Sequence, residues 1–198
     1  MKIALIAKKG GAGKTTICSL LHEAFRQTGQ TVAVRDYDRI QGTAVKSLSR
    51  FGGTAEQPGH AYHYLLIDTP PNLTMLPGGG ASAPVAAAAA AEADVVLIPT
   101  SPSPYDLWET EGTVRFVQRA NPKAIVRVVL NRTRAGTLLS GAATENLEGT
   151  SAPVLPVSLA ERQCYQHAGV GGWAALDPRA RQELLRFTVA VSSLIIGY

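Results

Sequence analysis

The residues best suited to chemistry lie near the start of the chain, where glycines, lysines and threonines are crowded together. Residues 9–16 read KGGAGKTT and separate an apolar run at 3–7 from a helix-like run at 17–21. Glycines let backbone N–H groups turn inward around a polyphosphate, and the N-terminus of a helix adds partial positive charge. The pattern therefore predicts a phosphate-binding loop in which Lys14 reaches the β- and γ-phosphates and the Thr15 hydroxyl binds Mg²⁺.

The loop differs from the common spacing G-x-x-x-x-G-K-[ST]. Lys8 stands where the first glycine would be, and a second lysine, Lys9, precedes the glycines. A glycine-rich turn with incidental lysines is the alternative, which the flanking strand and helix patterns disfavour. The residues of this loop that we expect to contact the ligand are Gly10, Gly11, Ala12, Gly13, Lys14, Thr15 and Thr16.

Carboxylates follow two further apolar runs. Asp68 ends the run YLLID, an arrangement in which a strand-end carboxylate holds Mg²⁺, often through water. Asp36 and Asp38 follow the run at 31–35, and the carboxyl ends of strands are where α/β proteins bind ligands. We expect Asp68 to join Thr15 as a metal ligand, and a plain strand-end turn residue is the weaker alternative. We expect Asp36 and Asp38 to lie at the ligand site, and a surface turn carrying two acids is the alternative.

Apolar runs alternate with helical patterns along the whole chain. This alternation predicts an α/β fold, with a mostly parallel twisted sheet covered by helices on both faces, in a single domain over residues 1–198. We expect Asp106 to cap its helix. The expected strands are 2–7, 31–35, 63–68, 94–99, 125–131 and 153–157, and the expected helices are 14–28, 42–50, 81–92, 106–120, 137–148, 160–168 and 178–195.

The composition is that of an ordinary globular protein. The chain has 198 residues, of which 45% are hydrophobic, and a formal net charge of +4, a mild bias that is compatible with a polyanionic partner. Its two cysteines, Cys18 and Cys164, have neither metal-binding nor redox-pair spacing. These lone cysteines indicate a reduced, cytoplasmic setting. No apolar stretch approaches 18 residues, so we expect no membrane span.

The run KGGAGKTT, together with IDTPP at 67–71, resembles the deviant Walker A ATPases of the ParA/MinD family, above all the small plasmid-partition ParA proteins (ParF-like). The resemblance implies a P-loop NTPase that uses ATP and Mg²⁺. It also implies that Lys9 crosses a dimer interface to the other subunit's nucleotide, although a solvated loop charge is the alternative. Asp38 matches the carboxylate that helps orient the attacking water, but Arg39 and Ile40 replace the family's proline.

The resemblance also predicts a role in adenine binding for one further region and in DNA binding for another. Asn131 would lie near the adenine pocket, where an amide offers both a donor and an acceptor, and an ordinary turn asparagine is the alternative. In the expected C-terminal helix, arginines would face outward to DNA while Leu184, Leu185 and Phe187 pack inward, the alternative being solvated helix charges. The candidate DNA contacts are Arg179, Arg181 and Arg186.

The implied function is a weak, partner-stimulated ATPase that positions a cargo. ATP would close a homodimer, the dimer would bind nucleoid DNA without sequence preference, and a ParB-like or other small cargo-adaptor protein would stimulate hydrolysis. A MinD-like membrane-associated regulator is an alternative, but residues 189–198 lack the basic amphipathic helix that it would need. A small-molecule ATP-dependent ligase on the same fold is a second alternative, and Lys9 and the 67–71 match disfavour it.

Overall fold

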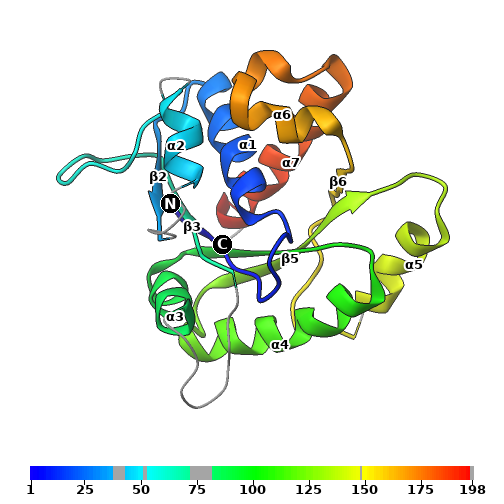
Figure 1. Cartoon of the computed structure of the whole chain (residues 1–198). Helices are drawn as coiled ribbons and strands as arrows, with labels where there is room; N and C mark the ends of the chain where they lie inside the picture. Colours follow the sequence, from blue (N-terminus) through cyan, green and yellow to red (C-terminus); the bar gives the residue numbers. More distant parts are fainter. Residues whose placement is uncertain (38–42, 51–52, 72–81, 148, 197–198) are drawn as a thin grey trace.

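The chain folds around a six-stranded parallel sheet, as this computed structural model of residues 1–37, 43–50, 53–71, 82–147 and 149–196 shows (Figure 1). The strand order is β2-β3-β1-β4-β5-β6. The strands are β1 Lys2–Leu5, β2 Val32–Asp36, β3 Tyr64–Asp68, β4 Val95–Thr100, β5 Ile125–Thr133 and β6 Leu159–Ala160. The helices are α1 Lys14–Gln27, α2 Thr43–Ser49, α3 Ser82–Glu92, α4 Pro104–Ala120, α5 Leu138–Leu147, α6 Gln163–Gly171 and α7 Pro178–Ile196, with a 3₁₀ turn, η1, at Gly172–Ala175.

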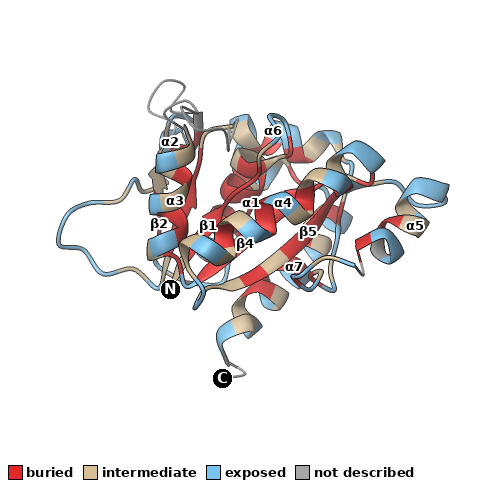
Figure 2. Ribbon diagram, turned by 90° about the horizontal axis from the view of Figure 1, so that it is seen from below, coloured by how far each residue is buried: buried red, intermediate tan, exposed pale blue. Residues whose placement is uncertain are grey.

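Helices cover both faces of the sheet, which confirms the predicted fold class. Helices α1, α2, α6 and α7 lie on one face and α3, α4 and α5 on the other (Figure 1). Side chains alternate along a strand, so Ile3 and Leu5 pack in the first layer while Ala4 and Ile6 pack in the second. Both layers are buried along the sheet and on the inner faces of the helices (Figure 2). Within the described ranges, every helix is too short or too polar to span a bilayer.

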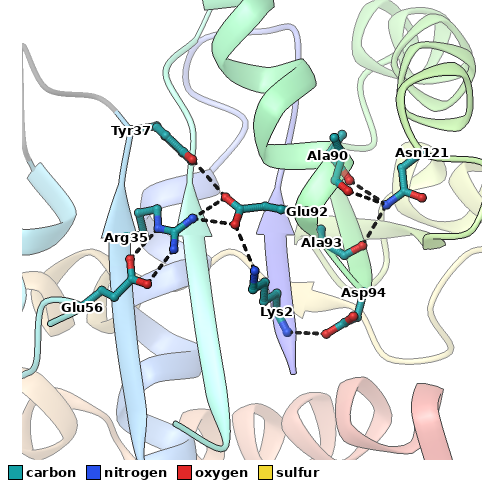
Figure 3. Close-up of polar contacts among 10 residues, drawn as sticks. Lys2, Arg35, Tyr37, Glu56, Ala90, Glu92, Ala93, Asp94 and Asn121 are labelled. Carbon is teal, nitrogen blue, oxygen red and sulfur yellow. Dashed lines mark hydrogen bonds and ion pairs between the residues drawn. The ribbon is translucent and has the colours of Figure 1, made fainter. Parts of the chain in front are cut away.

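An ion-pair cluster ties the last turn of α3 to the edge of the sheet. Arg35 of β2 lies between Glu92 and Glu56, at 2.5 Å from an oxygen of each, and Tyr37 and Lys2 also bond Glu92, at 3.0 and 3.2 Å (Figure 3). The cluster therefore joins the end of α3 to both β2 and β1 through charged groups.

Two sequence predictions of local structure are wrong. The strand expected at 153–157 is a single bridge, Val128 to Val154, because Pro153 and Pro156 have no N–H to donate to a ladder. The sixth strand instead lies at 159–160, and the helix expected from 160 therefore begins at Gln163.

The capping role predicted for Asp106 is also wrong. Helix α4 begins at Pro104 with Ser103 at the N-cap position, because proline suits the first helical residue. Asp106 lies within the first turn, and its carboxylate accepts hydrogen bonds from Lys9 and from the Ser101 hydroxyl instead.

Candidate functional site

The loop between β1 and α1 forms a cradle at the carboxyl edge of the sheet. Gly11 and Gly13 have φ values of +78° and +98°, a conformation that side chains rarely adopt. A Cβ on Gly13 would lie 2.2 Å from the Asn131 amide nitrogen, so a larger residue would displace this side chain from its hydrogen bond to Ala12. The cradle encloses about 190 Å³ and is lined by Gly11, Gly13, Lys14, Thr15, Thr16, Thr69, Pro71 and Arg132.

Lys14 brings a positive charge into this cradle from the first turn of α1. The residue is only 6% exposed, and its ammonium group donates a hydrogen bond of 3.4 Å to the Ala7 carbonyl oxygen. Gly10 and Ala12 stay outside the lining: Gly10 faces Pro71, and Ala12 is buried with its carbonyl bonded to Asn131. The loop thus presents one buried cation beside a helix N-terminus, a combination that suits an anion.

Thr15 and Asp68 form the polar floor beside Lys14. The Thr15 hydroxyl donates a 2.7 Å hydrogen bond to Asp68 Oδ2. Asp68 is 1% exposed, and within the described residues its Oδ1 atom has no hydrogen-bond partner. Burial, and to a smaller extent Asp36, raises the pKa of Asp68 to about 6, while Thr15 and Lys14 oppose that rise.

This floor fits a divalent cation held together with a polyphosphate. A hydroxyl and a carboxylate in contact are oxygen ligands that Mg²⁺ prefers. The described ranges contain no group of three or more His, Cys, Asp or Glu side chains that could hold a metal alone. A cation here would complete its shell with phosphate oxygens and water, as Mg²⁺ usually does.

Lys9 points to α4 and is not part of the cradle lining. It forms an ion pair with Asp106, and the neighbouring Lys8 pairs with Glu109 at 3.1 Å. The Lys9 side chain is half exposed, so solvent and a docking partner can reach it.

Asn131 joins the end of β5 to the cradle. Its amide nitrogen donates a 3.0 Å hydrogen bond to the Ala12 carbonyl, and its oxygen accepts one from the Arg132 backbone N–H at 3.0 Å. Sequence reasoning missed Arg132, which has a φ of +58° and lines both the cradle and a narrower hollow next to it. Such a backbone conformation leaves no clear signal in the sequence of an arginine.

Asp36 is the last residue of β2, and Asp38 follows two residues later. Asp36 accepts hydrogen bonds from the backbone N–H groups of Ala44 and Val45, at 3.1 and 3.4 Å, so it caps α2. Asp38 lies outside the described residues, as do the two residues that replace the family's proline.

The arginines of α7 differ in their surroundings. Arg179 and Arg186 are exposed, whereas the Arg181 guanidinium lies 5.7 Å from the centre of the Trp173 ring. Leu184 and Phe187 are fully buried, as predicted, but Leu185 is 37% exposed, so its predicted inward packing is wrong. One residue turns a helix by about 100°, which carries Leu185 off the core face toward the side of Arg186.

Comparison with known proteins gives the family. The family model of the CobQ/CobB/MinD/ParA nucleotide binding domain matches residues 3–169. A curated relative, maintenance of carboxysome distribution protein A of Halothiobacillus neapolitanus, is 30% identical over 203 residues, which cover 90% of this chain and 88% of the relative.

Solved structures share the fold at low identity. The cell division ATPase MinD of Pyrococcus furiosus has a TM-score of 0.72 at 17% identity, covering 98% of this chain and 99% of that one. Cobyrinic acid a,c-diamide synthase of Mycobacterium smegmatis, with bound ADP and magnesium, has a TM-score of 0.73 at 16% identity, covering 97% and 94%. At this low identity the solved structures establish only a shared fold, whereas the family model matches the sequence. The chain therefore belongs to the CobQ/CobB/MinD/ParA nucleotide-binding domain family.

Proposed function

We propose that this chain is a Mg²⁺-dependent ATPase that positions a cargo by switching between a monomer and a DNA-bound homodimer. The observation that carries the proposal is the convergence of buried Lys14 and the Thr15–Asp68 pair on one glycine-lined cradle. The 30% identical relative acts in carboxysome distribution, which supports a positioning role. A ParB-like or other small cargo-adaptor protein would stimulate hydrolysis and release the dimer from nucleoid DNA.

The residues of the cradle have distinct tasks in ATP binding. The Lys14 ammonium would bind the β- and γ-phosphates, and the long hydrogen bond to Ala7 is one of the contacts that it would give up. Thr15 and Asp68 are the candidate ligands for Mg²⁺, which when bound neutralises charge on the phosphates. Turned backbone N–H groups at Gly11 and Gly13 complete the anion site.

The surface around Lys9 suits a second copy of the chain. Tyr105 and Trp108 are 71% and 73% exposed and pack edge to face in the same helical turn as Asp106. The Lys9 side chain is half exposed although Asp106 is mostly buried, so Lys9 can exchange this ion pair for a nucleotide phosphate across an interface. The aromatic pair would then lose water contact in the dimer.

The outer face of α7 suits a polyanion. Arg179 and Arg186 are exposed on it, and a dimer would present two such faces. Phosphate contacts release counterions, so doubling their number raises affinity steeply and makes binding dependent on salt. The net charge of +4 is too small for tight binding by one subunit.

The decisive test is ATP binding and turnover by Lys14→Ala against a matched control, Lys8→Ala. Lys8 is a neighbouring lysine that pairs with Glu109 on the surface outside the cradle. We expect Lys14→Ala to lose Mg-ATP binding in calorimetry and Lys8→Ala to retain it. Tight binding by Lys14→Ala would refute the site. Turnover that required a metabolite and no protein partner would favour the ligase alternative.

A further inference from the structure

Glu183 of α7 gathers three hydrogen-bond donors from one short segment. Its carboxylate accepts bonds of 2.8 Å each from the Ala160 backbone N–H, the Arg162 guanidinium and the Tyr165 hydroxyl. Burial is the largest influence on the Glu183 pKa and raises it, but the three donors together hold the pKa below its ordinary value. A charged acceptor with three donors is a strong anchor.

The anchored segment forms one wall of a narrow hollow beside the cradle. The hollow shares Gly13, Thr16 and Arg132 with the cradle. Its remaining lining residues are Leu20, Asn131, Ala160, Glu161, Arg162, Tyr165 and Gln166. Because the hollow adjoins the cradle at these three residues, it is where we expect the nucleoside of a nucleotide whose phosphates bind Lys14.

Backbone pairing alone holds this wall poorly. Strand β6 is two residues long at the edge of the sheet, and its pairing with β5 is irregular between Asn131 and Thr133. One further backbone bond, from the Glu161 N–H to the Thr133 carbonyl at 2.9 Å, continues the pairing. The Arg134–Glu161 ion pair is exposed and contributes little. Leu159 and Tyr165 pack in the core on this face, and the Tyr165 hydroxyl also lies 3.2 Å from the Ala180 carbonyl of α7. The bonds to Glu183 add the polar contacts that fix Ala160 and Arg162, which face the hollow, against α7.

We propose that Glu183 is a positioning residue for the nucleoside part of the ligand, which it serves by holding the 160–165 wall in place. The inference rests on the proposed nucleotide binding. It separates the wall, which α7 positions, from the phosphate cradle, none of whose lining residues bonds Glu183.

The test compares ATP with inorganic tripolyphosphate, which can use only the cradle. For Glu183→Ala we expect the Kd for Mg-ATP to rise by about tenfold, which corresponds to the loss of about 1.4 kcal/mol. The Kd for tripolyphosphate should stay within about twofold, because the cradle is unchanged. Glu183→Gln should lie between, since one amide oxygen can still accept from part of the three donors.

A matched control separates positioning from general stability. Glu92→Ala breaks the ion pair with Arg35 on the opposite face of the sheet and should lower the melting temperature without changing the ratio of the two Kd values (Figure 3). If Glu183→Ala bound Mg-ATP and tripolyphosphate with the wild-type ratio of Kd values, for example because both were weakened equally, the inference would be wrong. If Glu183→Ala fails to fold, the same ratio measured in Glu183→Gln and Tyr165→Phe decides. Wild type that bound neither ligand would instead refute the proposed function.

Discussion

Asp68 is a carboxyl whose ionised form the ligand-free protein accommodates badly. It is almost fully buried, one of its oxygens has no hydrogen-bond partner in the described ranges, and burial raises its pKa from 3.8 to about 6. A rise of about two pKa units, at 1.36 kcal/mol per unit, lowers the free energy of unfolding at neutral pH by about 3 kcal/mol. We therefore expect Asp68→Asn to be more stable than wild type.

Proton binding by Asp68 makes the free energy of unfolding depend on pH. The native state binds this proton more tightly than the unfolded chain, so the wild-type free energy of unfolding falls as pH rises from about 4 to about 6. The penalty is fully present above that range. Asp68→Asn has no proton to lose, and its amide oxygen can still accept from Thr15. Its advantage should reach about 3 kcal/mol at pH 8 and shrink toward zero near pH 4.

Urea unfolding followed by circular dichroism measures this advantage. The measurements need EDTA, no nucleotide, and a series of pH values between 4 and 8. Asp94→Asn is the control because Asp94 is an exposed carboxyl at the opposite end of the strands, and it measures the effect of the same exchange outside the core. A variant that was less stable than wild type at pH 8, or equally more stable at every pH, would refute the reasoning about Asp68.

Three further predictions concern the loop and the two proposed surfaces. Gly13→Ala should weaken ATP binding and lower the free energy of unfolding by on the order of 1–3 kcal/mol. Gly29 also has a positive φ but open space around it, so Gly29→Ala should lose only the part that comes from backbone strain. Equal losses in urea unfolding would contradict the close approach of Asn131 to Gly13. Trp108→Ala should keep ATP binding but weaken ATP-dependent dimerisation in light scattering, and an unchanged dimer would exclude this surface. Replacing Arg179 and Arg186 with alanine should reduce ATP-dependent DNA binding at fixed salt without affecting the dimer; unchanged binding would place the DNA surface elsewhere.

The parts of the site that lie close together in sequence could be predicted from it. Gly13, Lys14 and Thr15 are consecutive, so the order of strand, glycine turn and helix defines the loop without knowledge of the rest of the fold. Asp68 ends a strand that pairs in register with β1, and parallel pairing brings its carboxylate to Thr15. The order of strands and helices could also be predicted, because each apolar run is a pattern of residues close together in sequence.

The parts that depend on tertiary contact could not be predicted. Strand β6 is too short to leave a periodic signal, and the apolar run around Pro153 and Pro156 resembled a strand although its prolines cannot donate. The contact between Glu183 and Arg162 joins residues on a loop and a helix whose packing no local pattern encodes. Asp106 had the residue type of a cap, but proline two positions earlier began the helix.

Several groups of the site lie in contacts that a bound nucleotide would have to replace. Lys14 donates a long hydrogen bond to a backbone carbonyl, Lys9 pairs with Asp106, and within the described residues one oxygen of buried Asp68 has no hydrogen-bond partner. The hydrogen bond from Lys14 to Ala7 is at the long end of the usual range, and the Lys9 side chain is half exposed. Mg-ATP would relieve the charge on Asp68 as it binds, so part of the binding free energy would come from removing a penalty that the free protein carries. The same argument explains why Asp68→Asn should stabilise the fold and still abolish the proposed activity.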